Sequence, residues 1–218
     1  MIIIGSSSLP TLQTLYNNLI ADVYTLTKRP DLIAETALAI RKATMKAHSA
    51  DMWKNDISTA IIILPVLPLG SQLSFRYAVD LTNVANFPLF RKVSSIDEYN
   101  TIPTGQELHF KELDSDRILD NYATEDINYW YQMGKQVNLR ANKNLTYLSV
   151  DYYQYPNITP ALYTSWIAQE FPDIIVCEAA ANIFKTIGKD NEAASYGNMF
   201  AGTDGESGHL HMLRMSEI

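Results

Sequence analysis

The sequence of 218 residues contains a single cysteine, Cys177. One cysteine cannot form a disulfide within the chain, and the apolar run Ile174–Val176 in front of it favours a buried, reduced thiol. No histidine or basic residue flanks Cys177 closely, which argues against a reactive nucleophile. We therefore predict a structural cysteine in a protein that is assembled inside the cell.

Long hydrophobic runs are also missing. The longest apolar stretch, Ala60–Leu69, is about half the length of a membrane-spanning helix, and Pro65 and Pro68 interrupt it. The N-terminal residues Met1–Gly5 contain no basic stretch and too short an apolar run for a secretory signal. We therefore expect no membrane contact and no export.

Basic residues are fewer than acidic ones, 17 against 24, so the formal net charge is −7. Such a chain repels duplex DNA mildly, and a general electrostatic grip on nucleic acid is not expected. The composition is otherwise ordinary for a globular protein, with 47% hydrophobic and 19% charged residues. The chain should therefore fold around a sizeable core.

Motifs that carry chemistry are missing as well. No phosphate-binding loop is present, and Gly5–Leu9 lacks the second glycine of a nucleophile elbow. Asp114–Asp116 begins like a calcium loop but lacks its glycine and its closing glutamate, and His209–His211 offers two ligands where zinc needs at least three. We predict no catalytic residue, no metal site and no cofactor.

The first part of the chain has the apolar spacing of helices. Apolar residues recur every three or four positions from Leu9 to Leu26, and Thr27–Asp31 then interrupts the pattern. Pro30 suits the first turn of a second helix, which should run from Asp31 to about Ser49. We predict that the two helices form an antiparallel hairpin, and that His48 caps or packs rather than catalyses.

The middle of the chain, from about Asp56 to Tyr155, contains β-branched and aromatic runs separated by turn residues. A hairpin turn is expected at Met133–Lys135, and a short helix at Asp116–Asn121. The predicted strands cover 57–64, 72–79, 90–96, 107–111, 127–133, 136–140 and 145–153.

Helical spacing returns near the C-terminus. Thr159-Pro160 predicts the start of a helix to about Glu170, and Pro172 starts another that ends before Gly188. A last helix should begin near Asp190. Three glycines within seven residues then predict an extended or adaptable tail over 201–218.

The order of helices, strands and helices predicts an α+β fold. The N- and C-terminal helices should form one bundle, and an antiparallel β region should be inserted between them. The predicted bounds are 9–55 and 157–200 for the discontinuous helical bundle, 56–156 for the inserted β-rich region, and 201–218 for the flexible C-terminal tail.

Tyrosine is unusually frequent, with 13 residues. Tyrosine combines apolar area with a polar end and is favoured at protein interfaces, although ordinary sheet packing explains any one of these residues equally well. A nucleic-acid stacking platform is less favoured, because few basic residues lie nearby in the sequence. The residues predicted for a subunit or tail interface are Tyr129, Tyr131, Tyr152 and Tyr155.

Particular stretches of the sequence resemble a known family. The run Asp22–Thr36, continued by Ala43–His48, resembles the opening helical hairpin of podovirus head-to-tail adaptor proteins of tailed bacteriophages. The resemblance extends over about Leu12 to Phe200, and the chain departs from it after Gly197. The later similar stretches are Asp151–Pro156, Trp166–Ala168, Phe171-Pro172 and Glu178–Gly188.

This resemblance implies a non-enzymatic structural protein of the virion, assembled in the host cytoplasm and located at the head-to-tail interface. Members of the family form dodecameric rings that bind the lower face of the portal protein, extend the DNA channel and provide a platform for tail or nozzle proteins. DNA would pass through the lumen of the ring without specific binding. Because the C-termini of the family commonly reach the portal, the resemblance implies portal contacts by Leu210, Met212, Leu213 and Met215.

Two other functions compete with this interpretation. A virion-associated cell-wall hydrolase would need two carboxylates facing each other across a cleft, about 5 to 10 Å apart. The acidic pairs Asp97-Glu98 and Glu125-Asp126 are more simply solvated turn residues. A minor tail or tail-tube subunit would also form rings without chemistry.

Overall fold

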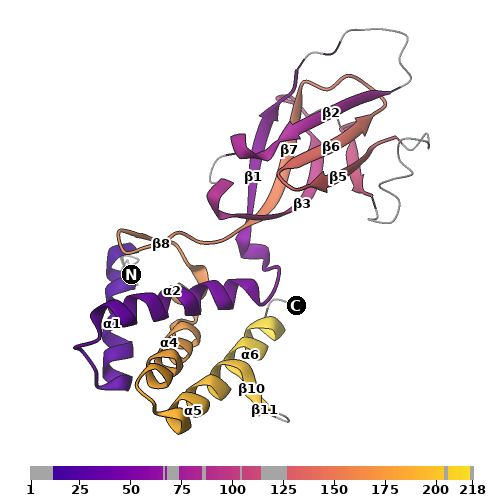
Figure 1. The fold of residues 1–218 in the computed structure, drawn as a ribbon. Helices are drawn as coiled ribbons and strands as arrows, with labels where there is room; N and C mark the ends of the chain where they lie inside the picture. Colours follow the sequence, from indigo (N-terminus) through magenta and orange to yellow (C-terminus); the bar gives the residue numbers. More distant parts are fainter. Residues whose placement is uncertain are drawn as a thin grey trace, which may run out of the picture. The chain divides into compact units, whose positions relative to one another are not determined.

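The computed structural model describes residues 12–65, 67, 74–84, 87–103, 105–113, 127–203 and 206–216 (Figure 1). The chain divides into two compact units. The first, which we call the helical unit, comprises Met1–Asp56 and Tyr155–Ile218, and the second, the β unit, comprises Ile57–Gln154. Each unit has its own hydrophobic core.

The helical unit begins with α1 (Leu12–Thr27) and α2 (Ile33–Ser49). Lys28 takes up a left-handed backbone conformation with φ of 56° and ends α1, and the Arg29 guanidinium holds the Asp31 carboxylate in the turn that follows. Both helices pack more extensively against α4 (Pro172–Thr186) than against each other (Figure 1). The predicted pairing of α1 and α2 in a hairpin is therefore a minor contact.

Helix α4 is the centre of the helical unit. Its residues Ile174–Ala181 are all buried, so the helix is covered on every side. It packs with α1, α2, α3 (Trp166–Glu170) and α5 (Asp190–Ala201), and Gly188, with φ of 74°, separates it from α5. The starts predicted at Pro172 and Asp190 are confirmed.

The helix predicted from Thr159 is wrong in its first half. The short strands β8 (Ile158–Thr159) and β9 (Leu162–Tyr163) form a hairpin there. The side chain of Asn157 accepts hydrogen bonds from the Thr159 backbone N–H and hydroxyl, which stabilises a turn instead of a helix start. The N-cap is Ser165, whose hydroxyl accepts from the Ala168 N–H at 3.2 Å.

The sequence predicts an extended or adaptable tail after Phe200, whereas the structure has two short strands and a helix there. Strands β10 (Gly202–Thr203) and β11 (Glu206–Ser207) pair, and α6 (His209–Ser216) follows. A Cβ atom on Gly208 would collide with the backbone nitrogen of Gly202, so this tight reversal requires glycine. The reversal brings α6 onto α5 and α4.

The predicted fold class is wrong in its β part, which is one seven-stranded mixed sheet curled into a half-barrel and not the antiparallel region that the sequence predicts. Along the sheet the strand order is β1-β7-β3-β4-β5-β6-β2, and all neighbours are antiparallel except β4 and β5, which are parallel. The strands are β1 (Ile57–Ile63), β2 (Phe75–Asp80), β3 (Phe90–Glu98), β4 (His109–Glu112), β5 (Tyr129–Met133), β6 (Gln136–Ala141) and β7 (Tyr147–Gln154).

Strands β4 and β5 are parallel neighbours. A parallel pair needs a connection of a dozen or more residues, and residues 114–126 between the two strands are long enough for that. That segment, including the helix predicted at Asp116–Asn121, lies outside the described residues. The hairpin turn predicted at Met133–Lys135 is confirmed between β5 and β6, with Gly134 at φ of 59°.

Buried residues alternate with more exposed ones along β2 and β7, and the buried ones form part of the core of the β unit. In β2, Phe75, Tyr77 and Val79 are buried and the residues between them are exposed. In β7, Leu148, Val150 and Tyr152 point the same way. β1 is different, because none of its residues is buried. The described residues also include three short 3-10 helices: η1 (Lys54–Asp56), η2 (Leu81–Asn83) and η3 (Phe87–Leu89).

Candidate functional site

The helical unit contains a cluster of polar side chains that resembles a catalytic constellation. The imidazole of His48, in the last turn of α2, has its Nδ1 atom 2.8 Å from Oδ1 of Asp56, in η1. Its Nε2 atom lies 2.9 Å from the hydroxyl of Ser165, the N-cap of α3. We call these residues, together with Trp166, the His48 cluster. A serine, a histidine and a carboxylate in this order are the parts of a hydrolytic triad.

Burial argues against catalysis by the His48 cluster. The exposed fractions are 0% for His48 and Ser165 and 5% for Asp56, so a substrate has no access to the serine hydroxyl. The hydroxyl of Ser165 is also occupied, because it caps α3 by accepting from Ala168. A triad needs an accessible nucleophile, whereas this cluster lies inside the core.

One arrangement of protons satisfies every member of the His48 cluster. Asp56 accepts from His48 Nδ1–H and from the Trp166 indole N–H at 2.9 Å. His48 Nε2 then accepts from the Ser165 hydroxyl. We assign the tautomer of His48 from this network. The cluster joins the end of α2, η1 and the start of α3, so its role is to hold these elements together.

A second buried pair extends the network. The hydroxyl groups of Thr44 and Tyr163 lie 2.5 Å apart, and both side chains are 0% exposed. Burial raises the pKa of Tyr163 to about 12, against the opposing effect of its hydrogen bonds to Thr44 and Ser165. Tyr163 is therefore neutral at physiological pH and acts as a packed, hydrogen-bonded core residue.

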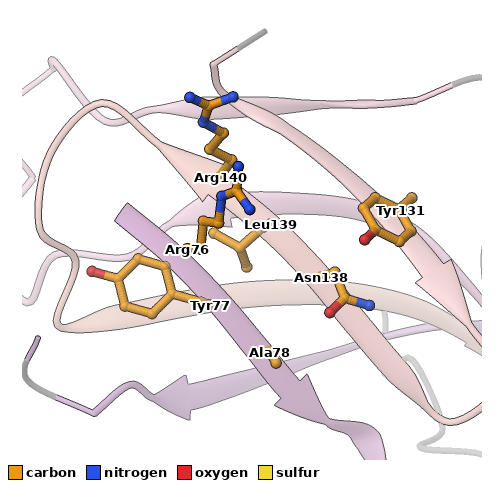
Figure 2. A pocket seen from close by; sticks show the side chains of 7 residues that line it. All are labelled: Arg76, Tyr77, Ala78, Tyr131, Asn138, Leu139 and Arg140. Carbon is orange, nitrogen blue, oxygen red and sulfur yellow. The ribbon is translucent and has the colours of Figure 1, made fainter. Parts of the chain in front are cut away.

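The β unit contains a shallow polar pocket on the outer face of β2, β6 and β5 (Figure 2). Its volume is about 150 Å³. Arg76 on β2 lies directly opposite Arg140 on β6, and Figure 2 shows the two side chains next to each other. The next pair in the register is Ala78 and Asn138, and Tyr131 of β5 lies opposite Asn138.

This pocket is suited to binding and not to chemistry. Two guanidinium groups in directly opposed positions repel each other and favour an anionic group between or beside them. Arg140 Nε donates to the Ser74 hydroxyl at 2.8 Å, which holds that side chain in position. Sequence analysis did not pair Arg76 with Arg140, because only the register of β2 on β6 brings the two together.

The structure distributes the four predicted interface tyrosines over both units. Tyr152 is 2% exposed in the β core, where its ring packs on Phe90 and burial raises its pKa. Tyr131 is buried at the pocket, Tyr129 is half-buried, and Tyr155 in the helical unit has its hydroxyl 3.2 Å from that of Ser49. Burial leaves Tyr131 and Tyr152 little surface for a partner, whereas Tyr129 and Tyr155 are half-buried.

The four predicted portal contacts lie on α6. Leu213 is 2% exposed in the core of the helical unit, Leu210 is half-buried against that core, and Met212 is 52% exposed. The side chain of Met215 lies outside what the structure describes. Arg214 fastens α6 to the end of α2, because it donates to the carbonyl of Ala50.

A groove of about 340 Å³ runs beside α6 in the helical unit. Its lining includes Glu170–Ile174, at the junction of α3 and α4, together with His209, Met212 and Leu213. We call it the α6 groove. Phe171 lines it and is 36% exposed. Sequence reasoning missed Phe171 because helical periodicity does not show which residues between two helices stay exposed.

The other surface that the sequence did not reveal is strand β1. Ile61 and Ile63 are 52% and 75% exposed, and Ile57 is 37% exposed. The run Ile57–Ile63 contains no charged residue, so its composition gives no sign that the strand is exposed. In the structure β1 is an edge strand.

Neither a metal-binding group of side chains nor a membrane-spanning helix is found in the part of the chain that is described. There, no three His, Cys, Asp or Glu side chains are grouped closely enough to hold a metal ion. Among the same residues, no helix combines the length and the apolar character of a membrane span. Burial, together with the nearby Asp173, raises the pKa of the Cys177 thiol.

No family model matches this chain, and no curated protein is significantly similar to it.

Proposed function

We propose that the chain is a non-enzymatic structural subunit of a tailed-bacteriophage particle, a head-to-tail adaptor. It would assemble as a ring under the portal protein, extend the DNA channel and provide a docking platform for tail proteins. The observation that carries the proposal is the exposed apolar edge strand β1, with Ile61 and Ile63 at 52% and 75% exposure. Uncharged edge strands of this kind pair with other chains unless they are covered.

The phage assignment depends on the resemblance of Asp22–Thr36 and Asp151–Pro156 to adaptor proteins. The His48 cluster supports the non-enzymatic part of the proposal, because the most catalytic-looking side chains of the described chain lie in the core. The net charge of −7 supports a lumen through which DNA slides, since few phosphate contacts would retard it.

The α6 groove is the surface that we assign to the portal. Leu213 belongs to the core of the helical unit, so it supports α6 and does not contact a partner directly. Met212 and Phe171 are exposed at the groove, and a flexible thioether beside an aromatic ring adapts well to an apolar partner. Of the four residues predicted on α6, Met212 is therefore the one that we expect to touch the portal.

Replacing Met212 by Asp tests this assignment. The side chain is 52% exposed, so the change should move the free energy of unfolding by no more than about 0.5 kcal/mol. Binding to the portal should fall by at least roughly tenfold, since a charge would be buried at the contact. Ile102→Asp, in the β unit and 79% exposed, is the matched control. Equal binding by both variants would remove the α6 groove from the portal interface.

Electron microscopy of intact particles tests the assignment as a whole. Labelled with an antibody fragment, the chain should appear as one ring directly below the portal. A position along the tail would identify a tail-tube or minor tail subunit instead, and absence from the particle would contradict a structural role in the virion.

A further inference from the structure

The curled sheet of the β unit has two edges that face one groove. Among the described residues, β1 pairs only with β7, and β2 pairs only with β6. The sheet curls so far that residues of both edge strands line the same groove, which has a volume of about 780 Å³. We call it the edge groove.

The lining of the edge groove shows that strand edges, and not strand faces, form its walls. Thr59–Pro65 contributes seven consecutive residues of β1 and the segment after it, and Ala78–Asp80 contributes three consecutive residues of β2. Successive side chains of a strand point to opposite faces. Consecutive residues can therefore line the same groove only along the backbone edge of the strand, with their side chains pointing alternately to the two faces of the sheet.

Such a groove is complementary to one more strand. Edge strands carry unpaired backbone N–H and C=O groups, which another extended segment can satisfy on both sides at once. Ala60 and Ile62, which face the core from β1, are only half-buried at this margin. An eighth strand would cover them, and eight strands make a barrel whose interior side chains just fill.

The directions of β1 and β2 determine whether an eighth strand would pair with each of them in a parallel or an antiparallel way. Following the antiparallel and parallel neighbours across the sheet, β1 and β2 run in opposite directions. A segment between them is therefore antiparallel to one and parallel to the other. The sheet already contains both kinds of pair.

The chain itself contains a segment with the right chemistry. Residues 1–11 precede the first described residue, and Ile2-Ile3-Ile4 is a β-branched run like the Ile61–Ile63 end of β1. Gly5–Ser8 follows, a composition typical of a flexible linker. Residues 5–11 can span at most roughly 25 Å between this run and α1.

We propose that residues Ile2–Ile4 of a second copy of this chain occupy the edge groove and complete the half-barrel. The partner strand gains backbone hydrogen bonds on both sides and covers the apolar margin of β1. Donation from each copy to the next is a head-to-tail contact, which generates a closed ring when the rotation between copies closes. The inference rests on the proposed function, since it supplies the contact between ring subunits.

Disulfide trapping between two single-cysteine chains tests the contact. Both chains carry Cys177→Ala, and one carries Ile3→Cys while the other carries Ile61→Cys. Mixed in the presence of the portal under mild oxidation, they should form a covalent heterodimer. Met133→Cys, 58% exposed in the same sheet but away from the edge groove, is the matched control for Ile61→Cys and should give on the order of tenfold less product.

The other results of this experiment overturn the proposal. Equal yields with Ile61→Cys and Met133→Cys, or no heterodimer in rings whose mass shows that they have formed, place the first residues elsewhere. If one chain carrying both Ile3→Cys and Ile61→Cys closes a disulfide at high dilution without dimerising, the segment comes from the same copy and the second-copy source is wrong.

A synthetic peptide separates this inference from the proposed function. A peptide of residues 1–8 carrying Ile3→Cys should form a mixed disulfide with the full chain carrying Ile61→Cys, in the absence of the portal and faster than with Met133→Cys. If the peptide is captured while the chain fails to bind any portal, the edge groove is a strand acceptor and the adaptor function is wrong. If neither peptide nor chain is captured while portal rings form, the adaptor function stands and this inference fails.

Discussion

The two units of the chain differ in which side chains stand out, buried polar groups in the helical unit and an exposed apolar strand in the β unit. In the helical unit, His48, Asp56 and Ser165 are buried and hydrogen-bonded to one another. In the β unit, Ile61 and Ile63 are exposed on an edge strand. The buried polar groups have partners within the chain, so they specify the fold of one unit. The exposed apolar groups have no comparable burial within the described residues, so they point to association.

We expect the largest loss of stability from Asp56→Ala, which removes the shared acceptor of the buried polar cluster in the helical unit. The substitution leaves the donors of the buried His48 and the half-buried Trp166 without their acceptor. Each unsatisfied donor costs roughly 1–3 kcal/mol, so we expect the free energy of unfolding to fall by about 2–6 kcal/mol. Asp51→Ala is the control, because Asp51 is half exposed and pairs with Arg214 on the surface. It should cost less than about 1 kcal/mol. Urea denaturation followed by circular dichroism measures both values.

A pair of isoleucines compares the two units directly. Ile40 of α2 is 0% exposed and Ile61 of β1 is 52% exposed. Ile40→Ala should lower the free energy of unfolding by about 2–5 kcal/mol, because it opens a cavity in the core. Ile61→Ala should change it by no more than about 0.5 kcal/mol. Similar denaturation midpoints for the two variants would contradict the contrast between a closed core and an open edge.

Alkaline pH should weaken the helical unit through Tyr163. Burial raises its pKa to about 12, from the ordinary value of 10.0 for tyrosine. Between pH 10 and 12 the unfolded chain loses this proton while the folded chain keeps it, so the stabilisation is complete below pH 10 and lost as the pH approaches 12. By pH 11 the loss from this group should reach roughly 1 kcal/mol.

Tyr163→Phe removes that dependence. The variant should be less stable than the natural chain at pH 8, by about 1 kcal/mol, because Thr44 loses its hydrogen-bond partner. The difference should shrink as the pH rises from 10 to 11. A constant difference over that range would show that Tyr163 does not ionise as its burial implies.

The smallest effect on stability, and the largest on assembly, should come from Ile61→Lys. A lysine on an edge strand is a common way to prevent pairing with other chains. We expect a change of less than about 0.5 kcal/mol in the unfolding of the isolated chain, together with loss of subunit association. Ile63→Thr, which keeps a β-branched side chain, should associate better than Ile61→Lys when sedimentation velocity is measured with the portal.

Local patterns were enough to locate most elements. The apolar spacing of the first helix, Pro172 before α4 and Gly134 in the β5–β6 turn all act within a few residues, so the sequence shows them directly. Thr159-Pro160 misled, because the amide of Asn157 stabilises a turn there and the N-cap lies at Ser165. The sequence offers both a helix start at Thr159-Pro160 and a turn at Asn157, and only the pairing of β8 with β9 shows that the turn forms.

The sequence did not predict how elements far apart in the chain are arranged. The order of the seven strands and the parallel pair β4–β5 bring together segments far apart in the sequence, and alternation within one strand does not show which strand lies beside it. The run Ile57–Ile63 has the composition of a central strand, and only its place at the edge makes it a candidate surface. The His48 cluster unites residues from positions 48, 56 and 165, and no spacing rule connects them.

The mass of the chain with its portal tests the central claim most directly. Purified chain and purified portal are mixed, and the mass of the complex is compared with that of each component. The account predicts a complex that has gained a full ring of chains, a dodecamer by resemblance to the adaptor family, with the portal complex of Ile61→Lys lacking that ring. A portal whose mass does not change when the natural chain is added would contradict the account.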